Sequence, residues 1–329
     1  MKYKLNPLLE TLFLLINSTW GKEQKKETIA EIDAIGLNGA AFYAIHFPLV
    51  ERYLAAFHKK RAKTAGDKIL EDVCQETWII LTAILWQHPE WVEIIEQIPE
   101  ETVYESVHSF LVEFFDDEED VIKALEQRGY PDKVKWQISA LLAQPKQRLS
   151  SVFTAVRENV PAYEYASAMF AGELDVLLAR LEERLAASGN SSLFKIPEKM
   201  GEKTQIVPTL AVPLGIVVID ELGLCGLLTP QLFTEDSTGY TKNEALLATK
   251  ALGDASKLEI LLALKEGSLY NLEIAKRTGL TPATTSHHMG LLLAAGLVEL
   301  DKKDGKAYYS FSADGIKRYI DWLEKSLLK

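Results

Sequence analysis

The chain has 329 residues, of which 47% are apolar and 25% charged, and its net charge is −11. This length predicts two domains, each able to bury a core, and the acidic balance excludes a protein that coats nucleic acid or anionic membrane without selectivity. The charge is uneven, because residues 241–329 hold 13 Lys and Arg against 11 Asp and Glu, net +2, which leaves −13 on residues 1–240.

The N-terminal stretch MKYKLNPLLETLFLLINSTWG is apolar but does not read as a signal peptide, because Glu10 interrupts it and no small-residue cleavage site follows. We expect a helix capped by Asn6, with Pro7 in its first turn. The longest uncharged run, residues 204–219, is too short to span a bilayer. Two distant cysteines indicate a reducing compartment. The sequence therefore predicts a cytoplasmic protein without a membrane segment.

Residues 7 to about 188 have apolar positions at the three- and four-residue spacing of helices, which predicts a compact bundle. Predicted helices begin near Pro7, Glu23, Ala40, Asp67, Pro89, Glu101, Glu118, Pro131 and Pro145. The last of them is long, and Pro161 is expected to break or kink it.

After residue 188 the pattern changes to the short β-branched runs SLFKIP, TQIVPTLAV, GIVVID and GLCGLL, which predict a small antiparallel sheet. A new helix then opens near Tyr240. The predicted fold is mainly α: a helical domain with a small antiparallel β element over residues 1–239, then a C-terminal winged helix-turn-helix domain over residues 240–329.

The C-terminal domain is predicted element by element. ALLATKALGDASKLEILLALKEG predicts two helices with a break near Gly253 and Asp254. NLEIAKRTG predicts a short helix stopped by Gly279, which can adopt the left-handed conformation of a tight turn. Thr281 caps the next helix, which ends near Ala295. Helix, tight turn and helix form a helix-turn-helix. The core candidates of the first two helices are Leu258, Leu261, Leu262 and Leu264.

A β-hairpin follows the helix-turn-helix. LVEL and AYYSFS are strand-like, and the DKKDGK between them contains an Asp-Gly hairpin signal, which predicts a wing. The last helix, from Asp314 to about Leu328, would pack Ile316, Ile320 and Leu323 inward or against a second subunit.

The run LGDASKLEILLALKEGSLYNLEIAKRTGLTPATTSHHMGLLLAAGLVELDKKDGKAYYSFS resembles the winged-helix domain of ArsR/SmtB-type transcriptional regulators. The resemblance covers about a quarter of the chain and implies DNA binding by a dimer that pairs through its terminal helices. The N-terminal part, opening NPLLETLFLL, is similar to an uncharacterised extension found on some members, and this transfers no activity.

Metal sensing is not expected from this resemblance. Metal-sensing members carry a Cys-x-Cys pair at positions that correspond to Tyr270 and Leu272, and neither side chain can bind a metal as a thiolate does. Other members use His and carboxylates on the final helix, but residues 314–329 contain no histidine. We therefore predict no metal or other cofactor at either place, and the neighbouring His287 and His288 lack partners at ligand spacing.

The expected recognition helix poses a problem, because residues 281–298 contain no charged side chain. Phosphate contacts and base contacts need not lie on one element. The residues of this helix that can reach base edges or phosphates are Thr284, Ser286, His287 and His288. The predicted phosphate contacts are Lys276, Arg277, Lys302, Lys303, Lys306 and the helix N-terminus at Thr281.

Other features permit two interpretations each. The acidic run Glu113–Asp120 could bind a hard cation, but it lacks the spaced ligands of a calcium loop, and a solvated helix junction is favoured. One set of aromatic residues could line a ligand pocket, but helical spacing favours core packing. This set comprises Tyr43, Phe47, Phe57, Trp78, Trp86 and Trp91.

The sequence therefore predicts a regulator that binds double-stranded DNA at an inverted repeat as a homodimer, and that represses transcription by occlusion. Its N-terminal domain would dimerise, sense a small-molecule effector, or do both. No catalytic motif occurs in residues 1–240, so we do not expect an enzyme. The alternatives are a winged-helix module that binds protein but not DNA, and an enzyme-regulator fusion.

Overall fold

The computed structural model describes residues 2–17, 21–34, 37–115, 120–186, 204–219, 221–232, 242–303 and 306–328. It divides into two compact units. We call Leu5–Trp20 with Leu49–Leu174 the helical unit, and Met1–Lys4, Gly21–Pro48 and Asp175–Lys329 the winged-helix unit. The predicted domain boundary near residue 240 lies outside the described residues and stays a prediction. Among the described residues, no helix has both the length and the apolar character needed to cross a membrane.

The described residues of the helical unit form helices and one 3-10 turn. In chain order these are α1 (Pro7–Ile16), the second half of α3 (Gly39–Lys60), α4 (Asp67–Leu70), α5 (Gln75–Gln87), α6 (Trp91–Ile94), η1 (Ile95–Gln97), α7 (Glu100–Phe114), α8 (Val121–Gln127), α9 (Asp132–Ala143), α10 (Pro145–Met169) and the start of α11 (Ala171–Ala186).

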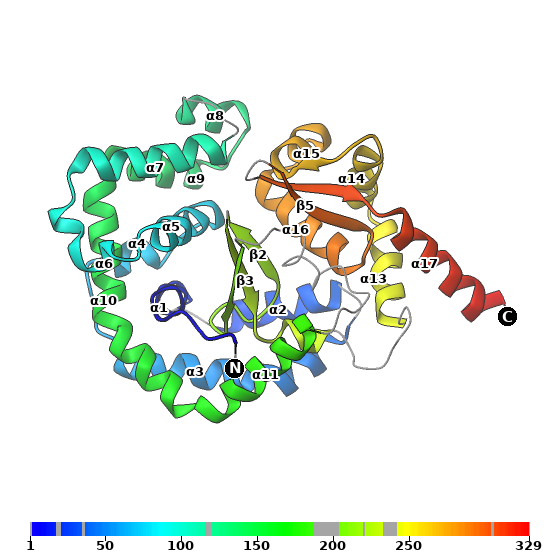
Figure 1. Ribbon diagram of the computed structural model, residues 1–329, viewed down its shortest axis with the longest axis horizontal. Coiled ribbons are helices and arrows are strands. Elements are labelled where there is room, and N and C mark those ends of the chain that lie inside the picture. The colour runs from blue at the N-terminus through cyan, green and yellow to red at the C-terminus, as the bar shows by residue number, and fades with distance from the viewer. Residues whose placement is uncertain are drawn as a thin grey trace. The chain divides into compact units, whose positions relative to one another are not determined.

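Helix α1 is the central element of this unit and packs against α5 and α10 (Figure 1). Every residue from Leu9 to Leu15 is buried, so the helix has no solvent face along this stretch. The predicted cap is confirmed: the Asn6 side-chain oxygen accepts hydrogen bonds from the Leu8 and Leu9 amides at 3.0 and 3.1 Å. A helix end buried in a core needs such partners for its first amides.

Helix α10 continues through Pro161, so of the expected break or kink at this residue the break was wrong, and the kink stays a prediction. Pro161 cannot donate to the carbonyl of Arg157, but it lies on the exposed side of the helix, where water can bond that carbonyl. Residues such as Val152 and Val156 bury the opposite side and hold the helix in place. The break comes instead at Phe170, before α11.

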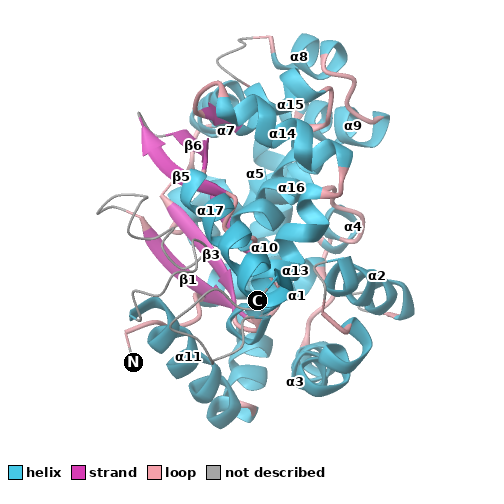
Figure 2. Cartoon of the chain, turned by 90° about the vertical axis from the view of Figure 1, so that its right-hand side faces the viewer, coloured by secondary structure: helices cyan, strands magenta, loops and turns pink. Residues whose placement is uncertain are grey.

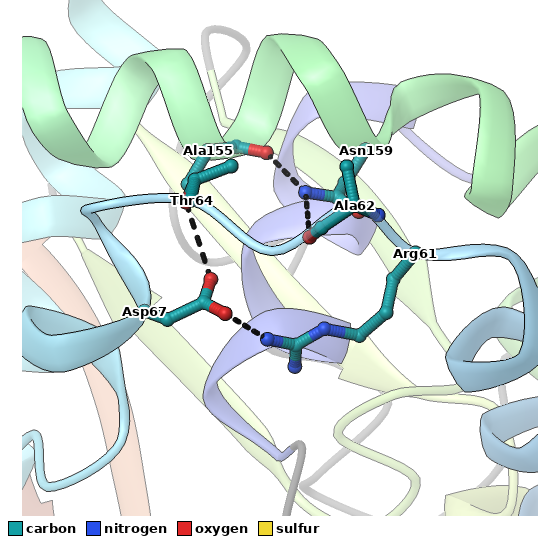
Figure 3. A network of polar contacts seen from close by, with 6 residues as sticks. All are labelled: Arg61, Ala62, Thr64, Asp67, Ala155 and Asn159. Atoms are coloured by element: carbon teal, nitrogen blue, oxygen red, sulfur yellow. Dashed lines mark hydrogen bonds and ion pairs between the residues drawn. The ribbon is translucent and has the colours of Figure 1, made fainter.

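A loop between α3 and α4 is fastened to α10 by Asn159, which is fully buried (Figure 3). The Asn159 amide oxygen accepts from the Ala62 amide at 2.8 Å, and its NH₂ group donates to the carbonyls of Ala62 and Ala155 at 3.2 and 2.9 Å. Beside it, Arg61 pairs with Asp67, which also accepts from the Thr64 hydroxyl. One side chain therefore satisfies loop backbone groups that water cannot reach.

The described elements of the winged-helix unit include two three-stranded sheets (Figure 2). Its elements are α2 (Lys22–Ala34), the first half of α3, most of α11, β1 (Gln205–Thr209), β2 (Ile216–Ile219), β3 (Leu222–Gly226), η2 (Thr229–Leu232), α13 (Lys242–Leu252), α14 (Ala255–Lys265), β4 (Leu269–Tyr270), α15 (Asn271–Thr278), α16 (Pro282–Ala294), β5 (Val298–Lys303), β6 (Lys306–Phe311), α17 (Ala313–Leu323) and the π-helical η3 (Glu324–Leu328).

The first sheet has the order β1-β3-β2 and is mixed, whereas we expected a wholly antiparallel one. β2 and β3 form the expected antiparallel hairpin, but β1 crosses to the far side of β3 and pairs with it in parallel. The run SLFKIP lies outside the described residues. Ile216 and Val218 of β2 pack against the core of the C-terminal winged helix.

The winged helix follows the predicted order of elements. Its sheet, of order β4-β6-β5, is antiparallel, and the short strand β4 adds a member that we did not predict. The predicted fold class is thus confirmed: mainly helical, with small sheets and a C-terminal winged helix-turn-helix.

For two of the four predicted core leucines, the predicted burial was wrong. Leu261 and Leu264 are buried, but Leu258 and Leu262 are 40% and 58% exposed. The reason is helical geometry, because residues four apart share one face of α14, and here that face points to solvent.

We expect Asn159→Leu to destabilise the protein by about 1–3 kcal/mol, because the Ala62 amide and carbonyl lose their partners inside the unit. Glu164→Ala, at an exposed position of the same helix, should change stability by less than about 0.5 kcal/mol. Denaturant unfolding of the full chain compares the two. Equal midpoints for both variants would contradict the role assigned to Asn159.

Candidate nucleic-acid interface

The turn between α15 and α16 depends on Gly279, whose φ of +70° lies in the left-handed region. The Leu280 amide then donates to the Ala275 carbonyl at 3.1 Å, which closes the end of α15. At the other end of this helix, the Glu273 carboxylate accepts from the Tyr270 amide at 3.1 Å. Both ends of α15 are therefore fixed by local signals, and these set the angle at which α16 leaves the turn.

Helix α16 has one buried face and one exposed face. Thr285, Met289 and Leu292 are fully buried in the core of the winged helix. On the opposite side, Thr284, His287 and Gly290 are exposed at three-residue spacing. This outward face of α16, defined by those three residues, is the part of the helix that a DNA groove could receive.

Thr281 caps α16 as predicted. Its hydroxyl oxygen accepts from the Thr284 amide at 3.1 Å and lies 2.8 Å from the Thr284 hydroxyl. The cap satisfies the Thr284 amide, the Thr285 amide donates to the Thr281 carbonyl at 2.8 Å, and Pro282 has no amide proton. Few amides at this helix end are therefore left for a phosphate, and the predicted phosphate contact at Thr281 stays a prediction.

Ser286 has a structural partner that the sequence did not suggest. The Asn271 side-chain NH₂ donates to the Ser286 hydroxyl at 3.0 Å, which joins the first turn of α15 to α16. The hydroxyl still has its own proton to donate. Its predicted role at a base edge stays a prediction, and Asn271 is added here as the residue that braces the two helices.

The two adjacent histidines have different surroundings. His287 is exposed on the outward face, whereas His288 is half-buried beside the start of α14. Burial lowers the pKa of His288, Lys257 lowers it further, and Asp254 opposes this. A neutral His288 therefore contributes to packing near α14, and His287 is the better placed of the two to meet a ligand.

The predicted basic residues flank α16 on both sides. Lys276 and Arg277 are exposed in the last turn of α15, and Arg277 forms an ion pair with Glu266 at 3.0 Å. On the other side, Lys303 and Lys306 pair across the end of the β5–β6 hairpin, with Lys302 next to them. The structure does not describe the lysine side chains of the hairpin, so their contacts with phosphate stay predictions.

Tyr270, one of the two positions for which the resemblance ruled out a thiolate ligand, takes part in an aromatic contact. The ring of Tyr270 meets that of Tyr308 edge-on, with ring centroids 5.6 Å apart. Among the described residues, no group of three or more His, Cys, Asp or Glu side chains is arranged to hold a metal ion. The expectation of no metal site remains a prediction.

The other candidate features fall mostly in the core or outside the described residues. Part of the acidic run, residues 116–119, lies outside the described residues. Tyr43, Phe47, Phe57 and Trp91 are buried, and Trp78 packs against Phe13 with ring centroids 5.5 Å apart. These contacts support the interpretation of the aromatic residues as core.

Comparisons with known proteins show what the C-terminal part of the chain is similar to. Residues 254–299 match the family model described as "Bacterial regulatory protein, arsR family". The chain is similar to "Transcriptional repressor SdpR" of Bacillus subtilis (strain 168), with 28% identity over 74 residues that cover 22% of this chain and 82% of that protein. Two solved structures of HlyU from Vibrio cholerae N16961, one of them reduced, are 27% identical to this chain with a TM-score of 0.22. They cover 26% of this chain and 94% and 90% of HlyU.

The C-terminal part of the chain is therefore an ArsR-type winged helix-turn-helix, as the sequence predicted, and this supports a DNA-binding regulator.

We expect Gly279→Ala to destabilise the protein by about 1–2 kcal/mol, because an L-residue resists the left-handed conformation. A Cβ at this position would meet no neighbour within 4 Å, so the effect would come from the backbone alone. Gly267→Ala is the matched control, since it is equally open but has no positive φ. Thermal unfolding compares them, and equal losses would show that the turn does not require glycine.

Proposed function

We propose that this protein is a homodimeric transcriptional repressor that binds an inverted repeat of double-stranded DNA and acts by occlusion in the cytoplasm. One observation carries the proposal: an ArsR-type helix-turn-helix presents an exposed, uncharged face between basic flanks. The similarity to a protein named as a transcriptional repressor supports it. The proposed role needs binding alone, without a cofactor or a catalytic step.

Base reading and phosphate binding fall to different residues in this proposal. Thr284 and His287 offer a hydroxyl and an imidazole from the outward face of α16 to base edges. The wing lysines and the last turn of α15 supply the positive charge for phosphates on either side. A neutral helix can therefore read DNA because its neighbours hold the backbone.

We expect Lys306→Ala to weaken binding to all duplexes alike and to reduce the slope of log affinity against log salt by about 0.9, because one counterion release is lost. His287→Ala should weaken binding to the preferred site by roughly 1–3 kcal/mol and leave the slope nearly unchanged. The preferred site comes from selection on random DNA, and binding is measured at several salt concentrations on specific and scrambled duplexes.

Lys317→Ala is the control for charge, since this exposed lysine on α17 is not one of the residues proposed to contact phosphates. It should leave the slope unchanged. If the wild-type protein shows no affinity for any duplex, or affinity without salt dependence, the alternative of a winged helix that binds only protein is favoured.

Dimerisation would use the terminal helices of the winged helix. The Thr249 hydroxyl on α13 lies 2.9 Å from the Tyr319 hydroxyl on α17, which holds these helices together. On α13, α17 and η3, respectively, Leu246, Ile320 and Leu327 are 37%, 54% and 72% exposed. Apolar side chains this open to water gain about 25 cal/mol for each Å² covered by a second copy.

We expect Ile320→Asp to convert the dimer to a monomer and to weaken operator binding, because the carboxylate would be buried at the contact. Leu262→Asp places the same charge at an equally exposed leucine of α14 and should preserve the dimer. Light scattering at micromolar concentration measures the mass. A monomeric wild-type protein, with and without DNA, would contradict the dimer.

The helical unit is proposed to sense an effector. A partly open groove of about 360 Å³ is lined by residues of α7, α8 and α9, a volume in the range of small-molecule sites. Its lining includes the stacked rings of Tyr104 and His108, and Ile122. Native mass spectrometry of the purified protein tests this proposal, which fails if no small molecule from cell extract binds and changes DNA affinity.

A further inference from the structure

The helical unit is strongly acidic, with 13 Lys and Arg against 23 Asp and Glu, net −10. Five of its 13 basic residues nevertheless fall within KKRAKTAGDK, residues 59–68, which we call the basic segment. The segment covers the end of α3, the loop that follows and the start of α4. Its one acid is Asp67, so it carries a net charge of +4.

The fold neutralises one of these five charges and leaves the other four exposed. Arg61 pairs with Asp67, and both side chains are largely buried. The remaining four basic residues are exposed lysines: Lys59, Lys60, Lys63 and Lys68. Of these, Lys60 places its ammonium 5.1 Å from the centre of the Tyr165 ring.

The other three lysines differ from the remaining basic residues of the unit. No described carboxylate lies at ion-pair distance from Lys59, Lys63 or Lys68. By contrast, each of the eight basic residues outside the basic segment has a partner. These eight are Arg52, Lys123, Arg128, Lys133, Lys135, Lys146, Arg148 and Arg157. The unneutralised positive charge of the helical unit therefore lies in one short segment.

The backbone of the basic segment is held against α10 (Figure 3). Asn159 bonds both backbone groups of Ala62, at 2.8 and 3.2 Å. A Cβ on Gly66 would lie 2.4 Å from the Ser151 carbonyl oxygen, so the loop packs directly on the backbone of α10. The ion pair within the segment joins the start of the loop to α4. A partner that binds the lysines therefore meets an ordered backbone, which lowers the entropy lost on binding.

Helix stability accounts for only part of this charge. Lys59 and Lys60 lie in the last turn of α3, where a cation is favourable because the last carbonyls have no partner within the helix. This reason does not extend to Lys63 in the loop, or to Lys68 in the first turn of α4, where a helix favours acids. Like charges gathered in one segment also repel one another. An anion bound from outside would offset this repulsion.

The chemistry of the basic segment fits phosphate. A lysine ammonium is a compact point charge that binds phosphate without a fixed geometry, whereas arginine is the side chain that grips a carboxylate by two hydrogen bonds. The one arginine of the segment is already paired. Residues 59–68, all of them described, include no exposed large apolar side chain, the usual anchor for a protein partner or a membrane surface. Duplex DNA carries one negative charge per about 1.7 Å of its axis, so several lysines on one ordered segment can each meet a phosphate.

We propose that the basic segment is a second DNA contact, in which Lys63 and Lys68, together with Lys59, bind phosphates of the same duplex that the winged helix reads. This inference rests on the proposed DNA-binding function and extends it to the helical unit. The contact adds affinity but no sequence preference, because phosphate contacts fix position and carry no base information.

The decisive variant of the full-length protein is Lys63→Gln combined with Lys68→Gln. Loss of two phosphate contacts should reduce the slope of log affinity against log salt by about 1.8. At about 0.15 M salt this corresponds to roughly tenfold to thirtyfold weaker binding. The duplex is the selected site with about 20 base pairs, two helical turns, of scrambled sequence on each side.

Lys133→Gln combined with Lys135→Gln is the matched control within the same unit. It changes the net charge by the same amount, but these two lysines are already paired with Asp72 and Asp132. The control should therefore leave the salt slope nearly unchanged. Thermal unfolding of both double variants verifies that each keeps its fold.

Chemical acetylation followed by mass spectrometry gives a second readout that needs no substitution. In the wild-type protein, saturating duplex should slow the acetylation of Lys63 and Lys68 and leave that of Lys133 unchanged. If wild type binds the duplex but the two double variants behave alike, or if the duplex does not slow acetylation of Lys63 and Lys68, the inference is wrong and the proposed function stands.

If wild type binds no duplex, the proposed function and this inference both fail. Flotation with vesicles of phosphatidylcholine and phosphatidylserine then identifies the other phosphate-bearing surface. Vesicle binding that is lost in the Lys63→Gln, Lys68→Gln variant, without duplex binding by wild type, would make the basic segment a membrane contact and overturn the inference.

Discussion

The burial of one side of α16 in the core of the winged helix determines what this protein can present to a ligand. Thr285, Met289 and Leu292 are fully buried, and a period of 3.6 residues then forces Thr284, His287 and Gly290 outward. A register shift of one residue toward the N-terminus would bury Thr284 and His288 in this row and turn Met289 outward. The core therefore selects the outward face, and the left-handed Gly279 and the cap at Thr281 fix its position at the turn.

An acidic protein can hold a polyanion because charge acts locally at physiological salt. The Debye length is about 8 Å under these conditions, so the −13 on residues 1–240 is screened from phosphates more distant than that. The net +2 on residues 241–329 is concentrated in the last turn of α15 and in the wing, on either side of α16.

Much of the fold was predictable because it depends on local signals. The pairing of strands that are far apart in the chain was not predictable. Asn6 and Thr281 were recognisable as caps and Gly279 as a helix stop, because each acts on neighbours within four residues. The parallel pairing of β1 with β3 and the short strand β4 depend on partners far along the chain. The start of α5 was missed because Cys74 gives it no side-chain cap.

Contacts between distant parts of the chain were also missed at the candidate site. Thr284 and His287 are exposed, whereas Ser286 and His288, which were named with them, are only partly exposed. The brace from Asn271 to Ser286 joins separate elements and was not predicted.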